Sequence, residues 1–206
     1  MIKYISIFLF LTTGLQFSHS QSVKKSFSKL SKPEKCWVIL HIFKAKCAYK
    51  TSLEVERTVD SIQNTILLDQ DKNGGQVDAF RHAYWMFRLA QNIGRRSAKT
   101  LGKAHEKGNY YQFKKSKLEH GEIPDEASSK MDLENNKKAL LLFKKYKKAN
   151  KKKIITLLVS EIKKGSFKIL NKDKNGNYLD CKNQVIPTNK LGKTWKNSKC
   201  LIPSKL

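Results

Sequence analysis

Acidic residues and long apolar runs are both scarce in this chain. Its 206 residues include 42 Lys and Arg against 17 Asp and Glu, which gives a formal net charge of +25. Beyond residue 20 no apolar run approaches the roughly 20 residues that a spanning helix needs, so the sequence predicts no transmembrane segment. There is also no internal repeat and no C-x-x-C pair. The missing pair disfavours a zinc site made of cysteines.

The excess of positive charge raises the question of an anionic partner. An anionic small molecule, a lipid or an acidic envelope component would each be attracted to such a chain. The excess is mostly lysine and is spread along the whole sequence. It lacks the arginine stripe and stacking aromatics of nucleic-acid readers, so sequence-specific nucleic-acid binding is disfavoured. Solvated lysine faces without a partner are the alternative.

The first 20 residues have the pattern of a secretory signal peptide. Lys3 supplies a positive start, residues 5–15 are mostly apolar, and Ser18-His19-Ser20 before Gln21 is a small-x-small cleavage site. We therefore expect a secreted or periplasmic protein.

Export changes the interpretation of the four cysteines, Cys36, Cys47, Cys181 and Cys200. An even number in an oxidising compartment predicts structural disulfides. The local pairs Cys36–Cys47 and Cys181–Cys200 are the simplest of three connectivities. On one straight helix, however, eleven residues span about 16 Å, too far for a disulfide. Either the helix breaks between Cys36 and Cys47, or each pairs with Cys181 or Cys200, and the connectivity stays open.

Helical periodicity dominates the chain up to residue 164. Apolar residues recur at helical spacing in segments 33–48, 51–68, 76–93, 97–107, 128–146 and 154–163. After residue 165 come short strand-like runs and an Asn-Gly turn. We predict a mainly α domain of about six helices with a small C-terminal β-hairpin cap. The expected division is a signal peptide (1–20), a flexible lead-in (21–32), the helical domain (33–164) and a disulfide-linked β tail (165–206).

The lysine-rich segment 137–164 has two interpretations. Its eleven lysines alternate with apolar stretches, as in amphipathic helices that touch an anionic membrane. A core-facing helix with a solvated lysine face has the same pattern, and we favour it.

Three polar clusters interrupt the apolar helices. They are Asp78-Ala-Phe-Arg81-His82, His105-Glu106 and Asp132-Leu-Glu-Asn135-Asn136. Spacings of three and four residues place side chains on one helical face, and buried acids, imidazoles and amides need partners. We therefore predict that the helices bring together one polar site, made of Asp78, Arg81, His82, His105, Asp132 and Asn136.

Each cluster also has a local explanation when it is taken alone. Asp78 can pair with its helical neighbours, and a single histidine on an apolar face is most often a satisfied core residue. Asp132 can cap a helix. Glu106 lies about 100° around the helix from His105, and we expect only His105 to be central. The coincidence on three helices is what favours a shared site.

Imidazoles and carboxylates together suggest hydrolysis. The order His82, His105-Glu106, Asp132 loosely resembles the H…HD…D order of metal-dependent phosphohydrolases of the HD class, with Glu106 in place of the aspartate. His82, His105 and Asp132 would then hold zinc or another divalent metal that activates water. Arg81 would bind an anionic substrate group. Metal-free acid–base catalysis by His82, oriented by Asp78, fits the sequence equally well.

The loop Asp69-x-Asp71-x-Asn73-Gly74 is similar to the first half of an EF-hand calcium loop. Position twelve is Phe80 instead of the glutamate that completes such a site. An Asx-rich turn that leads into the next helix is therefore favoured over calcium at Asp69, Asp71 and Asn73.

Three longer motifs together resemble an uncharacterised bacterial domain family. They are residues 74–85, 102–109 and 131–136, which contain the three clusters. The family occurs in small secreted proteins and, in related forms, near the C-termini of larger secreted or toxin-like proteins. The likeness covers residues 33–140 and the tail around 201–203, and it implies a shared architecture and site but no reaction. Lys137-Lys138 stands where the family continues with glycines.

Two hypotheses for function follow. The first is a secreted hydrolase whose His/Asp site, with or without a metal, acts on an anionic, phosphoester-type substrate. The alternative is a non-catalytic protein whose polar cluster fixes helix packing and whose basic surface binds an anionic envelope component. The sequence does not predict the substrate, the metal or the oligomeric state.

Overall fold

Six α-helices of nine or more residues make up most of the described part of the molecule. A computed structural model describes residues 27–118 and 121–205, so the predicted signal peptide lies outside the described residues. The helices are α2 (Lys32–Leu40), α3 (Ile42–Gln63), α4 (Gln76–Ile93), α5 (Arg95–Phe113), α6 (Glu126–Lys145) and α7 (Lys151–Lys163). Strands β1 (Lys168–Leu170) and β2 (Leu201–Pro203) pair antiparallel. The predicted mainly α fold with a small β element near the C-terminus is confirmed.

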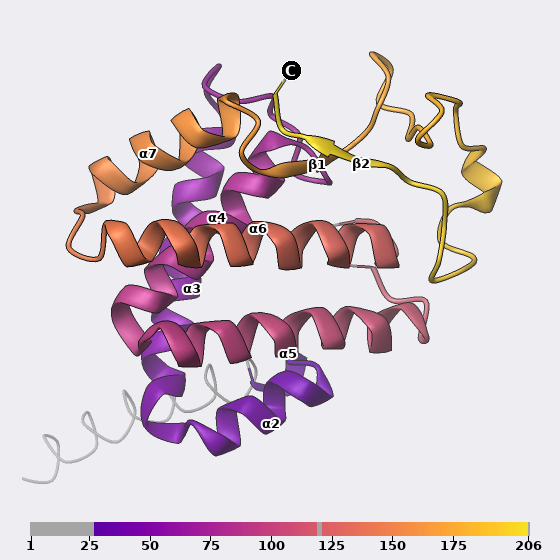
Figure 1. Cartoon of the computed structure of the whole chain (residues 1–206). Coiled ribbons are helices and arrows are strands. Elements are labelled where there is room, and N and C mark those ends of the chain that lie inside the picture. Colours follow the sequence, from indigo (N-terminus) through magenta and orange to yellow (C-terminus); the bar gives the residue numbers. More distant parts are fainter. Residues whose placement is uncertain (1–26, 119–120, 206) are drawn as a thin grey trace, which may run out of the picture.

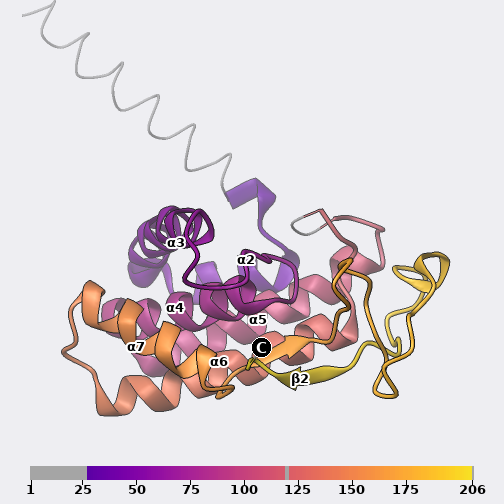
Figure 2. The same ribbon diagram turned by 90° about the horizontal axis from the view of Figure 1, so that it is seen from above.

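Helix α4 lies at the centre of the fold. It contacts α3, α5, α6 and α7 as well as β1, and Figures 1 and 2 show these elements around it. Burial on most sides explains why apolar residues occupy most of this helix, beside a stripe that includes the partly buried Arg81 and Arg88. Its fully buried side chains include Val77, Phe80, Tyr84, Phe87 and Leu89. Asp78 and His82 on this helix are therefore held inside the protein.

The loop before α4 is organised by aspartates. Asp69 accepts the Asp71 N–H at 2.9 Å and caps α4 by accepting the N–H groups of Gln76 at 2.6 Å and Val77 at 3.2 Å. These bonds form the favoured Asx-rich turn. The Lys172 ammonium donates to Asp71 Oδ2 at 2.6 Å and to the Asn73 carbonyl at 2.7 Å. The ammonium group of Lys172, from the tail, therefore contacts two of the loop residues that were considered as calcium ligands.

The helical path breaks at His41, which ends α2 and begins α3. Cys181 and Cys200, which are 19 residues apart in the sequence, form a disulfide. This is one of the two local pairs that the sequence suggested. The other local pair does not form, because Cys36 is exposed on α2 and Cys47 lies on α3 with its Sγ toward the Asn92 carbonyl. The disulfide fits an oxidising compartment, while export itself stays a prediction.

The lysine-rich segment faces the core, as favoured from its sequence. The apolar residues Leu140, Phe143, Ile154, Leu158 and Ile162 are buried, and most of the lysines between them are exposed. Among the described helices, none has the length and apolar character to cross a membrane.

The C-terminal tail is fastened to the helices by polar contacts. Ser204 donates from Oγ to the Ile162 carbonyl at 2.7 Å, and its own carbonyl accepts from Gln76 Nε2 at 2.8 Å. The Gly74 carbonyl accepts the Leu170 N–H at 2.7 Å, which attaches β1 to the loop before α4. The predicted Asn-Gly turn carries only an isolated bridge between Lys172 and Tyr178. Regular pairing occurs instead between β1 and the distant β2.

Candidate functional site

Three of the predicted site residues come together inside the helical domain. Asp78 and His82 project from α4, and Asp132 projects from α6, which packs against it. His82 Nε2 lies 3.4 Å from Asp78 Oδ1 and 3.3 Å from Asp132 Oδ1. All three residues are buried, with 6 %, 4 % and 5 % of their surfaces exposed, respectively. We call Asp78, His82 and Asp132 the polar centre.

Arg81 completes the surroundings of the polar centre. Its Nη2 donates to Asp78 Oδ1 at 2.6 Å and lies 3.2 Å from His82 Nε2. The second oxygen of Asp78, Oδ2, accepts the Gly74 N–H at 2.7 Å. Asp78 is thereby fixed from two sides, with Oδ1 turned toward His82. One turn of α4 and its preceding loop therefore orient the carboxylate.

The polar centre has the donor set and spacing of a cation site. In the part of the chain that the structure describes, Asp78, His82 and Asp132 form the one group of three such side chains, with ligand atoms within 4.8 Å of one another. An ion with four tetrahedral bonds of about 2.0–2.1 Å keeps its ligand atoms about 3.3–3.4 Å apart. The two measured distances from His82 Nε2 match that edge. Three ligands with space for a fourth are typical of catalytic sites.

Charge also favours a cation at this place. Asp78 and Asp132 bring two carboxylates, and Arg81 brings one guanidinium. Carboxylate oxygens beside an imidazole nitrogen are donor types that a divalent transition metal accepts.

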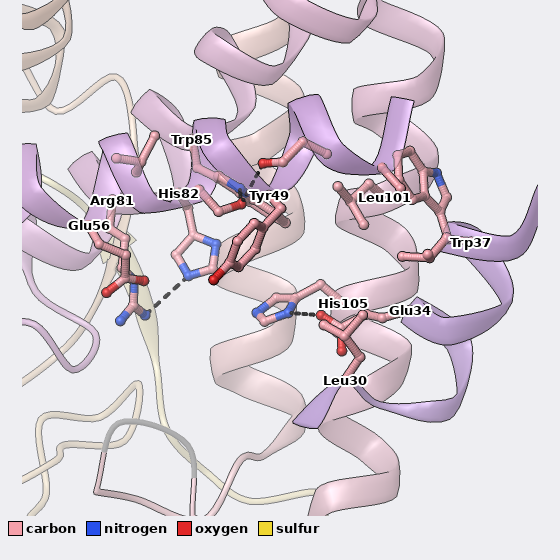
Figure 3. Close-up of a pocket in the computed structure, with 15 residues that line it drawn as sticks. Leu30, Glu34, Trp37, Tyr49, Glu56, Arg81, His82, Trp85, Leu101 and His105 are labelled. Carbon is pink, nitrogen blue, oxygen red and sulfur yellow. Dashed lines mark hydrogen bonds and ion pairs between the residues drawn. The ribbon is translucent and has the colours of Figure 1, made fainter. Parts of the chain in front are cut away.

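The polar centre lies between two cavities. The larger, of about 280 Å³, is a cleft between α2, α3, α4 and α5, shown in Figure 3. Arg81 and His82 lie at one end of this cleft, and Trp37 and Leu101 lie at the other. The smaller cavity, of about 40 Å³, is lined by Asp78, Asp132, Arg81, Asn73, Gly74, Glu122, Ile123, Pro124, Ser128 and Tyr178. Arg81 borders both cavities.

His105 lies beside the polar centre rather than within the group of three. Its ring centroid is 6.3 Å from that of His82 and 5.5 Å from that of Trp85. His105 Nδ1 lies 3.0 Å from Glu34 Oε1, so α2 and α5 are joined across the cleft (Figure 3). Its role as a metal ligand stays a prediction, and Asp78 is the third side chain that the structure brings to His82 and Asp132.

Glu34 has a perturbed pKa because of its position on the cleft wall. Burial acts to raise the pKa, but the hydrogen bond and charge of His105, with the bonds to Ser31, hold it below the ordinary 4.5. Glu34 also closes the capping box of α2, since Oε2 accepts the Ser31 N–H at 2.8 Å. Glu34 had no place in the predicted site. In the sequence, Glu34 stands out only as the third residue after Ser31, the spacing of a capping box.

Glu106, the neighbour of His105 in the sequence, is buried among the packed helices. It is 5 % exposed and accepts from Asn109 Nδ2 at 3.1 Å. Helix α5 packs against α2 with one face and against α4 and α6 with another, so adjacent residues His105 and Glu106 both find partners. Ala98 and Gly102 precede Glu106 at intervals of four residues and carried this signal, because small residues at helical spacing allow close packing.

The two adjacent asparagines of α6 have different surroundings. Asn135 binds the backbone of Lys168 twice, donating to its carbonyl at 2.9 Å and accepting its N–H at 2.8 Å. Asn136 is 5 % exposed, and neither atom of its amide has a hydrogen-bond partner among the described residues. A Cβ on Gly102 would lie 3.3 Å from Asn136 Nδ2. Asn135 thus secures the tail, and Asn136 keeps its amide available to a small ligand or water.

The tail closes the smaller cavity with a buried polar group. Tyr178 donates to Glu122 Oε2 at 2.7 Å, and Lys199 Nζ lies 3.7 Å from the Tyr178 ring centroid and 2.8 Å from Asp125 Oδ2. Burial, followed by the hydrogen bond and charge of Glu122, raises the pKa of Tyr178 above its ordinary 10.0. The phenol therefore stays protonated. Sequence patterns alone did not connect these tail residues with the helices.

Comparison with known proteins gives one family and no named relative. No curated protein and no solved structure gives a significant match to the chain. Residues 35–166 match the family described as "Domain of unknown function (DUF6973)". The matched range contains the whole polar centre, His105 and Asn136, and it stops before the tail. Because it spans well over half of the sequence, the chain belongs to the DUF6973 family.

Proposed function

We propose that this protein is a hydrolase of anionic, phosphoester-type substrates whose polar centre binds a divalent transition metal such as zinc. The observation that supports this proposal is the convergence of Asp78, His82 and Asp132 at the ligand spacing of a tetrahedral ion. A bound ion of this kind lowers the pKa of water and polarises a phosphoryl oxygen.

The residues around the polar centre have complementary roles in this proposal. Arg81 borders both cavities, and its guanidinium matches the geometry of a phosphoryl group. The apolar walls of the cleft, including Trp37 and Trp85, receive the less polar part of the substrate. Asn136 supplies amide groups from the next turn of α6 after Asp132.

Metal binding is the first test. The purified protein is stripped with a chelator and dialysed against zinc, manganese or cobalt, and bound metal is counted by elemental analysis. We expect about one ion per chain, at least tenfold weaker binding in His82→Ala and Asp132→Asn, and unchanged binding in the matched control His41→Ala. Including His105→Ala tests the remaining predicted ligand. Circular dichroism verifies that each variant is folded.

Activity is the second test. The loaded protein is assayed with mono- and diester nitrophenyl phosphates, and turnover should disappear in His82→Ala and fall strongly in Arg81→Met. Absence of both stoichiometric metal and phosphoester turnover would contradict the proposal.

One observation favours the alternative of a structural network. Arg81 already brings a positive charge to Asp78 and His82, so the group can be stabilised without an ion. In that case Asp78→Ala unfolds the protein or lowers its stability by several kcal/mol, as loss of a buried ion-pair partner does, and no metal binds. The metal assay therefore separates the two functions directly.

A further inference from the structure

The turn between α2 and α3 exposes an apolar cluster. Ile39, Leu40, Ile42 and Phe43 are 66 %, 79 %, 67 % and 98 % exposed. They flank His41, where one helix ends and the next begins. We call these four residues the apolar tip. No described residue covers it, and such exposure of adjacent large apolar side chains marks an interaction surface.

Basic residues surround the apolar tip. Lys44, Lys46 and Lys50 follow it on α3, and the stretch 39–50 contains no acidic residue. Lys44 Nζ donates to Ser97 Oγ at 2.8 Å, which places the start of α5, with exposed Arg95 and Arg96, next to the tip. Apolar side chains within a ring of cations match the interface of an anionic bilayer, where apolar groups enter the acyl boundary and cations meet headgroups.

We propose that the protein docks on anionic lipid membranes through the apolar tip. Two features favour a membrane over a protein partner. The tip protrudes, since Phe43 is 98 % exposed, and none of its four residues is part of the lining of the cleft. Its basic surroundings match the uniform negative charge of anionic headgroups. Docking uses no residue of the polar centre, so the protein could dock on membranes whether or not it has the proposed hydrolase activity.

Docking at this place brings the cleft close to the membrane. Trp37 and Val38 precede the tip, and Ala45 and Ala48 follow it, and all four line the cleft. The end of the cleft away from Arg81 is therefore next to the docked surface (Figure 3).

Vesicle co-sedimentation tests the proposal. The purified protein is mixed with vesicles of phosphatidylcholine alone or with an equal share of phosphatidylglycerol. We expect binding to the anionic vesicles and at least a tenfold loss in the double variant Leu40→Asp with Phe43→Asp. Ile66→Asp is the matched control, because Ile66 is 95 % exposed in a different loop, and it should bind as the original protein does.

A charge-matched pair tests the ring of cations. Lys46→Glu with Arg96→Glu removes charge beside the tip, whereas Lys152→Glu with Lys163→Glu removes the same charge from α7. The first pair should weaken binding at least threefold more than the second. Equal losses would mean general attraction of a basic protein and would overturn docking by the tip.

Insertion is measured separately with Phe43→Trp. The new indole should shift its emission to shorter wavelength and be quenched by brominated lipids in anionic vesicles. Lack of vesicle binding, or binding that the aspartate variants leave unchanged, would overturn the proposal. Self-association in sedimentation velocity that Phe43→Asp abolishes, without vesicle binding, would assign the tip to a second copy of the chain instead.

Discussion

The two sides of the polar centre are built in different ways. On the cleft side, four helices supply a mostly apolar wall that is continuous with the core. On the tail side, the smaller cavity is closed by the charged and hydrogen-bonded group of Tyr178, Glu122 and Lys199, from segments with little regular structure. The difference indicates a division of roles. The cleft side has the space for a ligand, and on the tail side the smaller cavity lies between the two carboxylates and this polar group.

The largest effect should come from cutting the disulfide on the tail side. Closing a loop of 19 residues stabilises a fold by about 3 kcal/mol in the chain-entropy description. In Cys181→Ser with Cys200→Ser we expect faster hydrogen exchange of the tail and of the loop before α4, with α2 and α3 little changed.

The two unbonded cysteines provide the control for this experiment. Cys36→Ser with Cys47→Ser makes the same chemical change on the cleft side, where no bond is lost. If the disulfide variant lost as much protection from hydrogen exchange in α2 as in the tail, the two sides of the polar centre would not be stabilised independently, and the comparison would be wrong.

The adjacent asparagines give an intermediate effect. Asn135→Ala removes two hydrogen bonds to Lys168 and should lower the free energy of unfolding by about 1–3 kcal/mol. Asn136→Leu removes no bond to a described residue and should change it by less than about 1 kcal/mol, while turnover falls. Urea denaturation and the phosphoester assay measure the two results. Large destabilisation by Asn136→Leu would support the structural network instead.

The smallest effect should be pH-dependent and confined to the cleft side. Because the pKa of Glu34 is lowered in the folded protein, its ionised form stabilises the fold above the ordinary value of 4.5, and this contribution is lost as the pH falls through the lowered pKa. Glu34→Gln should therefore be less stable at neutral pH by less than about 1 kcal/mol. The difference between the two proteins should close on acidification below pH 4.5. Denaturation curves at neutral and acidic pH check this, and a constant difference would contradict it.

The sequence predicted the fold well because helical periodicity is a local property. The spacing of Asp78 and His82 predicted that they share one face of a helix, and the coincidence of polar residues on three apolar helices led to the prediction of a shared site with Asp132. What periodicity does not contain is which helices become neighbours. Glu34 was missed for that reason, since its partner His105 lies on another helix. The contacts of Lys172 and Tyr178 join positions about a hundred residues apart and leave no local pattern.

Gly74 links strand β1 directly to Asp78 of the polar centre. Its N–H binds Asp78 and its carbonyl binds Leu170 of β1, and an added Cβ would lie 2.7 Å from Leu170 Cδ1. A single residue therefore joins the strand to the carboxylate without room for a side chain between them. Any ligand that requires Asp78 in its present orientation favours an attached strand, and by reciprocity an attached strand increases the affinity for that ligand. Strand β1 would in this way adjust the strength of a site to which it contributes no ligand.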